Sequence, residues 1–322
     1  MYNSSMLTFT NQTMMEIIKI LQVSLITCKP KDIVEFKVIN PDTATSLYNG
    51  NIVTCNDIEY IYRGYKSWMD LAHLLKCKML TPQTADEPSV VIRYEKLNKD
   101  NSFHTNITDK EEKYGTDSIF GEIHKNEEAS FIYYYMQALE NVQVNRRTRI
   151  LNLGINSGDE FEVIASLADN FGELELVGID YCASAITAAK EKFQKFTNIS
   201  LQVGDINKLE KLNLGHFDLI ISIGTLQSSN LQYNKLLMSI VQNQLKKDGA
   251  MILGFPNCRW IDGEMIYGAR VKNYAFSEMG LLYKDVIFAK KYLQQKKFRV
   301  TITGKDYTFL TATSIRKDDL SV

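Results

Sequence analysis

The chain is 322 residues long, and at ~150 residues per domain this length predicts about two domains. Hydrophobic residues make up 45% of it and charged residues 23%, which excludes an intrinsically disordered, collagen-like or coiled-coil protein. The net charge of −1 gives no overall attraction to nucleic acid or to anionic membranes.

Cysteine and histidine residues are too scattered to predict a metal site or a disulfide framework. The five cysteines form no C-x-x-C pair, and none of the four histidines lies near one at metal-ligand spacing. The most apolar N-terminal stretch, residues 17–26, is interrupted by Lys19 and Gln22 and is far shorter than the ~20 residues that cross a bilayer. It also lacks the basic region and cleavage site of a signal peptide, so we expect a cytoplasmic protein without a membrane partner.

Residues 1–96 have the pattern of a small α+β domain. Apolar residues recur at helical spacing over Met14–Leu21, and a second helix is expected over Ser67–Cys77, capped by its serine. Asn49-Gly50 is a hairpin signal among the β-rich runs. The expected strands are residues 33–39, 46–53, 58–62 and 89–94. A polar stretch at residues 97–117 follows, and we expect it to be a linker.

From residue 118 to residue 322 strand and helix patterns alternate, which predicts a parallel sheet flanked by helices. The expected strands are residues 149–153, 174–179, 199–203, 217–221 and 250–255, and the expected helices are residues 126–142, 161–169, 183–196 and 233–245. Two further β-rich runs, 298–303 and 307–315, are separated by three residues, which can join antiparallel strands but cannot carry a parallel crossover. We therefore predict an α/β fold with a mostly parallel seven-stranded sheet that ends in an antiparallel hairpin.

Glycine and acidic residues follow the strands of this sheet at regular intervals. Gly154 and Gly158 lie between the first strand and its helix, where glycine lets the backbone approach a ligand and the helix N-terminus offers unpaired N–H groups. Asp180 ends the second strand and can accept hydrogen bonds from both hydroxyls of a ribose, and Asp205 follows the third strand. Because ligands of open α/β sheets bind beyond the carboxyl ends of the strands, these residues indicate one crevice.

On these motifs, residues 118–315 resemble a class I S-adenosylmethionine-dependent methyltransferase. The family's glycine-rich loop matches LNLGINSG, its ribose-binding acid matches Asp180, its adenine-contacting acid matches Asp205, and its fourth-strand segment matches FDLIISIGTLQ. The resemblance implies S-adenosyl-L-methionine as the cofactor and requires no metal. The cofactor-binding residues that it implies are Gly154, Asn156, Ser157, Gly158, Asp159, Asp180, Tyr181, Asp205, Ile206 and Ser222, with Tyr114 from the segment before the first strand.

Two residues depart from the family pattern. Asn152 stands where an acidic residue commonly ends the first strand, which removes a charge that could face the methionine ammonium, and Asp159 is a candidate replacement. Asn156 replaces the middle glycine of the loop. Asparagine tolerates left-handed backbone angles better than most residues, so the turn can persist.

Residues beyond the fourth and fifth strands should face the transferred methyl group. Our candidates for catalysis are Asn257, Arg259, Asp262 and Glu264, since arginine can clamp an anionic group and a carboxylate can act as a base. Arg270 is a second candidate for the clamp. Residues 246–305 contain 12 Lys and Arg against 5 Asp and Glu, which favours an anionic substrate. The family's N/D-P-P-Y/F sequence for methylating adenine or glutamine is replaced by SIGTLQ, which disfavours that reaction.

We therefore expect a methyltransferase that acts on an O or N nucleophile, with a small molecule favoured over RNA or protein as the substrate. Two alternatives stay open at this point: a nicotinamide-dependent oxidoreductase, and a non-catalytic cofactor-binding module on the same fold. The N-terminal domain carries no chemical motif. It recognises a macromolecule, forms a homodimer interface or caps the pocket, and the sequence does not rank these roles.

Overall fold

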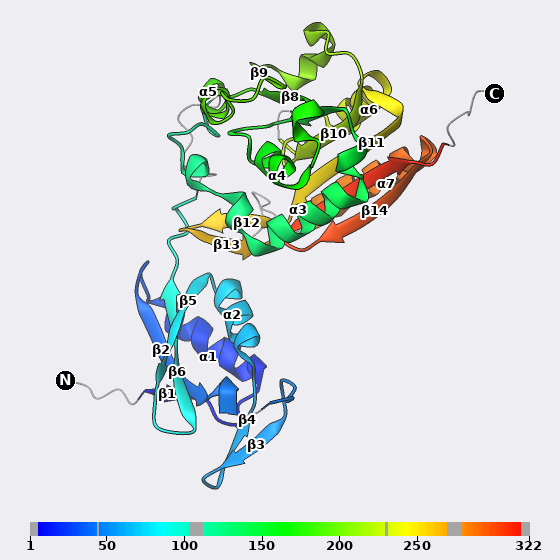
Figure 1. Cartoon of the computed structure of the whole chain (residues 1–322). Coiled ribbons are helices and arrows are strands. Elements are labelled where there is room, and N and C mark those ends of the chain that lie inside the picture. Colours follow the sequence, from blue (N-terminus) through cyan, green and yellow to red (C-terminus); the bar gives the residue numbers. More distant parts are fainter. Residues whose placement is uncertain (1–5, 44, 103–111, 229–230, 269–278, 317–322) are drawn as a thin grey trace. The chain divides into compact units, whose positions relative to one another are not determined.

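The computed structural model describes residues 6–43, 45–102, 112–228, 231–268 and 279–316. The chain folds into two compact units (Figure 1): unit 1 consists of residues 1–102 and 260–266, and unit 2 of residues 103–259 and 267–322. The sequence does not predict that residues 260–266 group with the N-terminal region. Part of the expected linker, residues 103–111, lies outside the described residues.

Unit 1 is built on a four-stranded sheet in the order β1-β2-β6-β5, and its two helices pack on one face of that sheet. On this face the rings of Trp68 and Tyr94 contact Phe36, at centroid distances of 5.7 and 5.1 Å. Alternate residues point to the other face, where Arg93 Nε donates to Glu35 Oε1 at 2.9 Å. The elements are β1 (Leu7–Thr8), α1 (Met14–Ile26), β2 (Ile33–Ile39), η1 (Pro41–Thr43), β3 (Ile52–Cys55), β4 (Ile58–Ile61), α2 (Tyr65–Leu74), β5 (Cys77–Thr84) and β6 (Ser89–Lys96). The hairpin of β12 (Cys258–Ile261) and β13 (Glu264–Tyr267) belongs to unit 1 only from residue 260 to residue 266.

Two local expectations for unit 1 are wrong. The β3–β4 hairpin turns at Asn56-Asp57, where both residues have positive φ (48° and 59°), and not at Asn49-Gly50, which precedes β3. Helix α2 begins after Gly64 as its N-cap, so Ser67 lies inside the helix and caps nothing. Both differences arise because asparagine, aspartate and serine occur at several positions where a turn or a cap fits their side chains.

Unit 2 contains the predicted seven-stranded sheet, in the order β14-β15-β11-β10-β7-β8-β9. Strand β15 runs antiparallel to both of its neighbours, and the other pairs are parallel, so the prediction of a mostly parallel sheet with a terminal antiparallel hairpin is confirmed. The strands are β7 (Arg149–Leu153), β8 (Glu175–Asp180), β9 (Ile199–Val203), β10 (Phe217–Ile223), β11 (Leu245–Pro256), β14 (Phe298–Gly304) and β15 (Tyr307–Ser314). The helices are η2 (Ile119–Glu122), η3 (Lys125–Glu127), α3 (Ala129–Asn141), η4 (Val144–Arg146), α4 (Asp159–Leu167), η5 (Phe171–Glu173), α5 (Ala183–Lys192), η6 (Ile206–Leu212), α6 (Tyr233–Asn243) and α7 (Gly280–Gln295).

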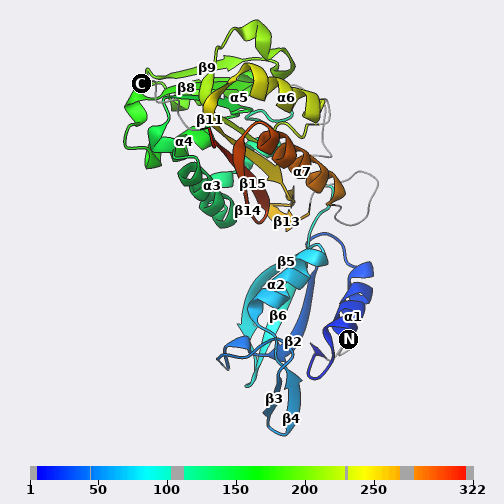
Figure 2. The same ribbon diagram turned by 90° about the vertical axis from the view of Figure 1, so that its right-hand side faces the viewer.

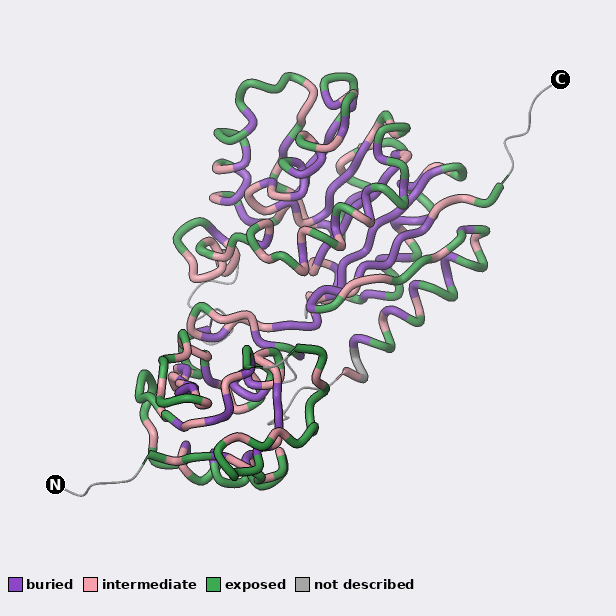
Figure 3. Tube along the Cα trace, turned by 60° about the horizontal axis from the view of Figure 1, so that its bottom comes forward, coloured by how far each residue is buried: buried purple, intermediate pink, exposed green. Residues whose placement is uncertain are grey.

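Helices cover both faces of this sheet: α3 and α4 lie on one face, and α6 and α7 lie on the other (Figure 2). Leu151 of β7 belongs to the core that α6 and α7 complete with Leu237 and Leu293. On the opposite face Tyr135 of α3 stacks on Phe309 of β15, with ring centroids 6.0 Å apart. Strands β7, β8, β10, β11 and β15 are therefore buried along most of their length, whereas β9 and β14 at the two edges of the sheet are largely not (Figure 3). We look for functional residues in the loops at the ends of the strands. Among the described helices, none is long and apolar enough to cross a membrane.

Candidate functional site

The glycine-rich loop joins β7 to α4 through residues that adopt left-handed backbone angles. Gly154 and Gly158 have φ of 80° and 94°. A Cβ atom at Gly154 would lie 1.8 Å from Oγ1 of Thr225, and one at Gly158 would lie 2.3 Å from the ring of Phe193. Neither position accommodates a side chain, so the loop from β10 and the helix α5 pack directly against the backbone of this turn.

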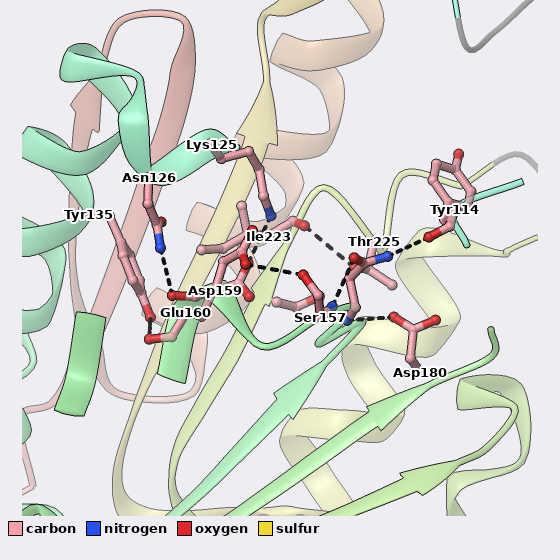
Figure 4. A network of polar contacts seen from close by, with 12 residues as sticks. Tyr114, Lys125, Asn126, Tyr135, Ser157, Asp159, Glu160, Asp180, Ile223 and Thr225 are labelled. Carbon is pink, nitrogen blue, oxygen red and sulfur yellow. Dashed lines mark hydrogen bonds and ion pairs between the residues drawn. The ribbon is translucent and has the colours of Figure 1, made fainter. Parts of the chain in front are cut away.

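Asn156 preserves the turn, as the sequence predicts, and forms three hydrogen bonds that hold it. Its φ is 47°, and its backbone N–H donates to Oδ2 of Asp180 at 2.9 Å. Its side chain donates from Nδ2 to the carbonyl of Tyr114 at 2.7 Å and accepts at Oδ1 from the N–H of Ser157 at 2.8 Å (Figure 4). A glycine at this position would lose both side-chain bonds, so Asn156 couples the segment before β7 to the loop.

Asp180 lies at the carboxyl end of β8 and joins this loop to the next one. Its Oδ1 accepts the N–H of Cys182 at 2.9 Å, while Oδ2 accepts that of Asn156. Burial raises the pKa of the Asp180 carboxyl, and the backbone hydrogen bonds oppose that rise. Burial and the Asp180 charge also raise the pKa of the Tyr114 hydroxyl, whose ring meets that of Phe120 edge to face at 4.9 Å. The structure therefore places Tyr114 beside the loop, on the side of Asp180.

The other residues expected to bind the cofactor lie at the ends of the neighbouring strands. Asp205 is the N-cap of η6, and hydrogen bonding from the Asn207 N–H lowers the pKa of its carboxyl. Ile206, directly after it, is buried. Tyr181 is 55% exposed at the end of β8. Ser222 is buried in β10, where its hydroxyl donates to the carbonyl of Leu153 at 3.2 Å.

A buried ion pair supports the start of α4, and sequence reasoning missed it. Lys125 Nζ lies 3.1 Å from Oε1 of Glu160, and the two side chains are 9% and 2% exposed. Burial opposes the charge of Lys125, but Glu160 and Asp159 raise its pKa overall. Asn126, the next residue, donates from Nδ2 to the carbonyl of Asp159 at 3.0 Å (Figure 4). The sequence does contain one signal for this burial: Glu160 stands beside Phe161 on the apolar side of an amphipathic helix.

The two polar residues that the sequence singles out beside the loop have different surroundings. Asn152 is 1% exposed, and neither side-chain polar atom has a hydrogen-bond partner among the described residues. Asp159 accepts from the hydroxyl of Ser157 at 3.1 Å and forms an ion pair with Lys192 at 3.2 Å. Lys192 therefore already compensates part of the negative charge by which Asp159 could replace an acid at position 152.

The four candidates for catalysis divide between the two units. Asn257 and Arg259 belong to unit 2, and the backbone N–H of Asn257 donates to the carbonyl of Asp306 at 2.7 Å. Asp262 and Glu264 belong to unit 1, where they form ion pairs with lysines, and their catalytic role stays a prediction. Arg270 lies outside the described residues. Within the described part of the chain, no three metal-ligating side chains gather at a distance that could hold an ion.

Comparison with known proteins gives a family match over half of the chain. The model of a family described as "Methyltransferase domain" matches residues 145–306, which include the loop, Asp180, Asp205 and strands β7 to β11. Among curated proteins, carboxy-S-adenosyl-L-methionine synthase of Helicobacter pylori (strain HPAG1) is 27% identical over 157 residues. That alignment covers 47% of this chain and 63% of the relative, so the match spans less than two thirds of the relative's length.

Solved structures of methyltransferases are also similar to this chain. The N-methyltransferase NodS from Bradyrhizobium japonicum, in complex with S-adenosyl-L-homocysteine, is 16% identical and has a TM-score of 0.41, with 58% of this chain and 89% of that chain covered. The CurJ carbon methyltransferase is 15% identical with a TM-score of 0.42, and 83% of this chain and 77% of that chain are covered.

Proposed function

This chain belongs to the methyltransferase-domain family, and from that premise we propose that it transfers a methyl group from S-adenosylmethionine to an O or N nucleophile of a small anionic substrate. The observation that carries the proposal is the hydrogen bond between the Asn156 N–H and the carboxylate of Asp180. It joins the glycine-rich loop to the ribose-binding candidate at the edge of the sheet where ligands of such folds bind. Family membership favours this activity over the nicotinamide alternative.

The residues at this edge fit the cofactor. The carboxylate of Asp180 accepts backbone N–H groups of Asn156, Cys182 and Tyr181, and its two oxygens offer about four acceptor sites, so it can also accept from a ribose hydroxyl. Asp205 is held ionised by its hydrogen bonds and can accept from an amine such as that of adenine. Gly154 lacks a side chain where the backbone must approach the methionine part closely.

Bound S-adenosylmethionine supplies an electrophilic sulfonium methyl group. The chain's own residues bind the ribose and adenine, fix the loop through Asn156 and orient the acceptor in line with the methyl carbon. Asn257, directly after β11, is 5% exposed, and its Oδ1 has no hydrogen-bond partner among the described residues. That oxygen can accept a hydrogen bond from the O–H or N–H of the acceptor and so aim its lone pair at the methyl group.

We infer an anionic substrate from the basic residues in the sequence around the fifth strand. Residues 246–305 have an excess of lysine and arginine over acidic residues, and Arg259 directly follows Asn257 and Cys258. A guanidinium group at this place binds a carboxylate or phosphate with two parallel hydrogen bonds. The absence of the N/D-P-P-Y/F sequence supports an acceptor other than a nucleobase or glutamine amine.

Calorimetric titration of the full chain with S-adenosylmethionine and S-adenosylhomocysteine tests cofactor binding. We expect Asp180→Asn to weaken binding about 10–100-fold, since one charge-assisted hydrogen bond contributes ~1.5–3 kcal/mol. The matched control is Glu175→Gln at the other end of β8, where the carboxylate pairs with Arg149. Equal affinities of both variants and the wild type would contradict the assignment of Asp180.

Transfer is tested separately with a methyl-labelled cofactor and fractionated small-molecule extracts. Label in an anionic product, lost in Asn257→Ala while cofactor affinity is retained, is the expected outcome. Cofactor binding without transfer to any fraction would favour the non-catalytic module instead.

A second candidate activity comes from the curated relatives. Two further H. pylori sequences with the name carboxy-S-adenosyl-L-methionine synthase are 25% identical over the same length of 157 residues. This similarity supports making or using a cofactor that carries an extra carboxyl group. Adding a carboxyl group requires a carboxyl-donating co-substrate, so the full chain is incubated with S-adenosylmethionine and fractionated small-molecule extracts, and the cofactor is then examined by mass spectrometry. A cofactor heavier by one carboxyl group would support the second activity, and an unmodified cofactor in every fraction would contradict it.

A further inference from the structure

An open groove of about 530 Å³ lies at the opposite edge of the unit 2 sheet from the proposed cofactor site. It is formed where the C-terminal end of α3 meets β14 and β15, beside the residues that lead into β7. Figure 2 shows α3 next to these two strands. Its lining is almost entirely polar and includes four arginines. The lining residues are Asn141, Gln143, Arg146, Arg147, Asp248, Arg299, Thr301, Thr311, Thr313, Ser314 and Arg316.

Carboxylates of the described residues form no ion pair with the four arginines of the groove. Asp248 is the one acidic residue in the lining. Backbone carbonyls orient two of them instead: Arg147 Nε donates to Val142 at 2.8 Å, and Arg316 Nη2 donates to Lys296 at 2.7 Å. Burial lowers the pKa of Arg147, although Asp218 and Asp248 oppose that shift. The groove therefore holds an excess of positive charge that an anion would stabilise.

Hydroxyl groups line the floor of the groove. On the paired strands β14 and β15, Arg299 lies opposite Thr313 and Thr301 lies opposite Thr311, so all four side chains share one face of the sheet. That face is apolar at Phe309, where α3 covers it, and becomes polar two residues further along β15. Threonine hydroxyls and guanidinium groups on one surface are hydrogen-bond donors suited to phosphate oxygens.

We propose that this groove binds a small molecule through a phosphate or diphosphate group. The planar guanidinium matches two phosphate oxygens at once, and four of them around one floor allow several oxygens to be bound. A volume of about 530 Å³ falls within the ~300–1,000 Å³ of small-ligand sites. The chain's net charge of −1 gives no long-range attraction to a polyanion, so we assign the phosphate to a small molecule and not to RNA.

Calorimetry on the full chain tests this site with inorganic pyrophosphate, inorganic phosphate and a short single-stranded RNA. Arg299→Gln and Thr301→Val change exposed groove residues whose side chains form no hydrogen bond with another described residue. We expect each to weaken pyrophosphate binding, by about tenfold for Arg299→Gln. Lys290→Gln, which removes the same charge from an exposed position of α7, should change it less than about twofold.

The affinity for S-adenosylhomocysteine should stay unchanged in all three variants, which separates this site from the proposed function. No binding of pyrophosphate by the wild type, or equal effects of Arg299→Gln and Lys290→Gln, would overturn the proposal. RNA binding tighter than pyrophosphate, and weakened by Arg299→Gln, would replace the small molecule with a nucleic acid.

Discussion

The loop at residues 154–160 and the hairpin residues 260–266 are both short polar segments, but different forces hold them. The loop depends on left-handed glycines that touch their neighbours directly and on the buried pair of Lys125 and Glu160. The hairpin depends on ion pairs of Asp262 and Glu264 with lysines that are 61% and 47% exposed. The loop is therefore shaped by close packing and buried charge, while solvent and protons reach the contacts of the hairpin.

The largest effect should come from breaking the buried charge pair of the loop. Lys125→Met leaves the carboxyl of Glu160 buried without its partner, and we expect the full chain to lose ~3–5 kcal/mol of stability. Burial already raises the pKa of Glu160, and loss of Lys125 raises it further. A carboxyl whose folded pKa lies above its unfolded value destabilises the folded state at neutral pH, so the loss should shrink as the pH falls through the folded pKa.

Denaturant unfolding, followed by far-UV circular dichroism, measures this loss of stability at neutral pH and at acidic pH. The double variant Lys125→Met with Glu160→Gln is the control, because it removes both charges and should recover much of the stability. A single variant as stable as the double variant at neutral pH would show that the pair does not hold the loop.

A smaller effect, on binding, is expected from the backbone of the loop. Gly154→Ala places a Cβ atom at φ of 80° against Thr225, and we expect the affinity for S-adenosylhomocysteine to fall by at least about 100-fold. Gly172→Ala in η5, where a Cβ meets nothing within 4 Å, is the matched control and should bind as the wild type does. Retention of full affinity by Gly154→Ala would mean that the cofactor does not approach this turn.

The sequence predicts the loop better than the hairpin, because the loop follows local sequence patterns and the hairpin depends on contacts with residues far away in the chain. The strands, the helix starts and the glycines of unit 2 follow local patterns, and the strand-ending position of Asp180 follows from the strand before it. Asp262, by contrast, accepts hydrogen bonds from Asn98 and Asn101, more than 160 residues earlier in the chain. Periodicity carries no information about such a contact, and the catalytic role predicted for Asp262 and Glu264 depends only on their distance from the fifth strand in the sequence.

Long-range pairing also explains why the sequence does not predict the Lys125–Glu160 ion pair or strand β5. Lys125 and Glu160 are 35 residues apart, so the position of Glu160 on the apolar side of its helix indicates burial but does not identify Lys125 as its partner. Strand β5 contains Lys78 and Pro82, which weaken a strand pattern, and it is held by its antiparallel pairing with β6. These elements depend on tertiary contacts, whereas the seven strands of unit 2 also satisfy local preferences.

The smallest effect should come from the hairpin, and it should depend on pH. Asp262 accepts from the N–H of Asn98 and from Nδ2 of Asn101 and lies 3.0 Å from Lys31 Nζ. Burial raises the pKa of its carboxyl, but these partners lower it overall. We expect Asp262→Asn to cost unit 1 ~1–2 kcal/mol at neutral pH. A lowered folded pKa gives stability that is present above the unfolded value of about 3.9 and is lost as the pH falls through the folded value.

Tryptophan fluorescence isolates this effect, because the two tryptophans of the chain, Trp68 and Trp260, both belong to unit 1. The unfolding midpoint of Asp262→Asn should lie below that of the wild type at pH 7 and converge with it as the pH falls below about 4. Asp86→Asn is the control, since its carboxylate is fully exposed and lies 3.8 Å from Lys37. Coincident midpoints at pH 7 would show that the hairpin is held by the apolar contacts of Ile261 and Ile266 instead, which protons do not reach.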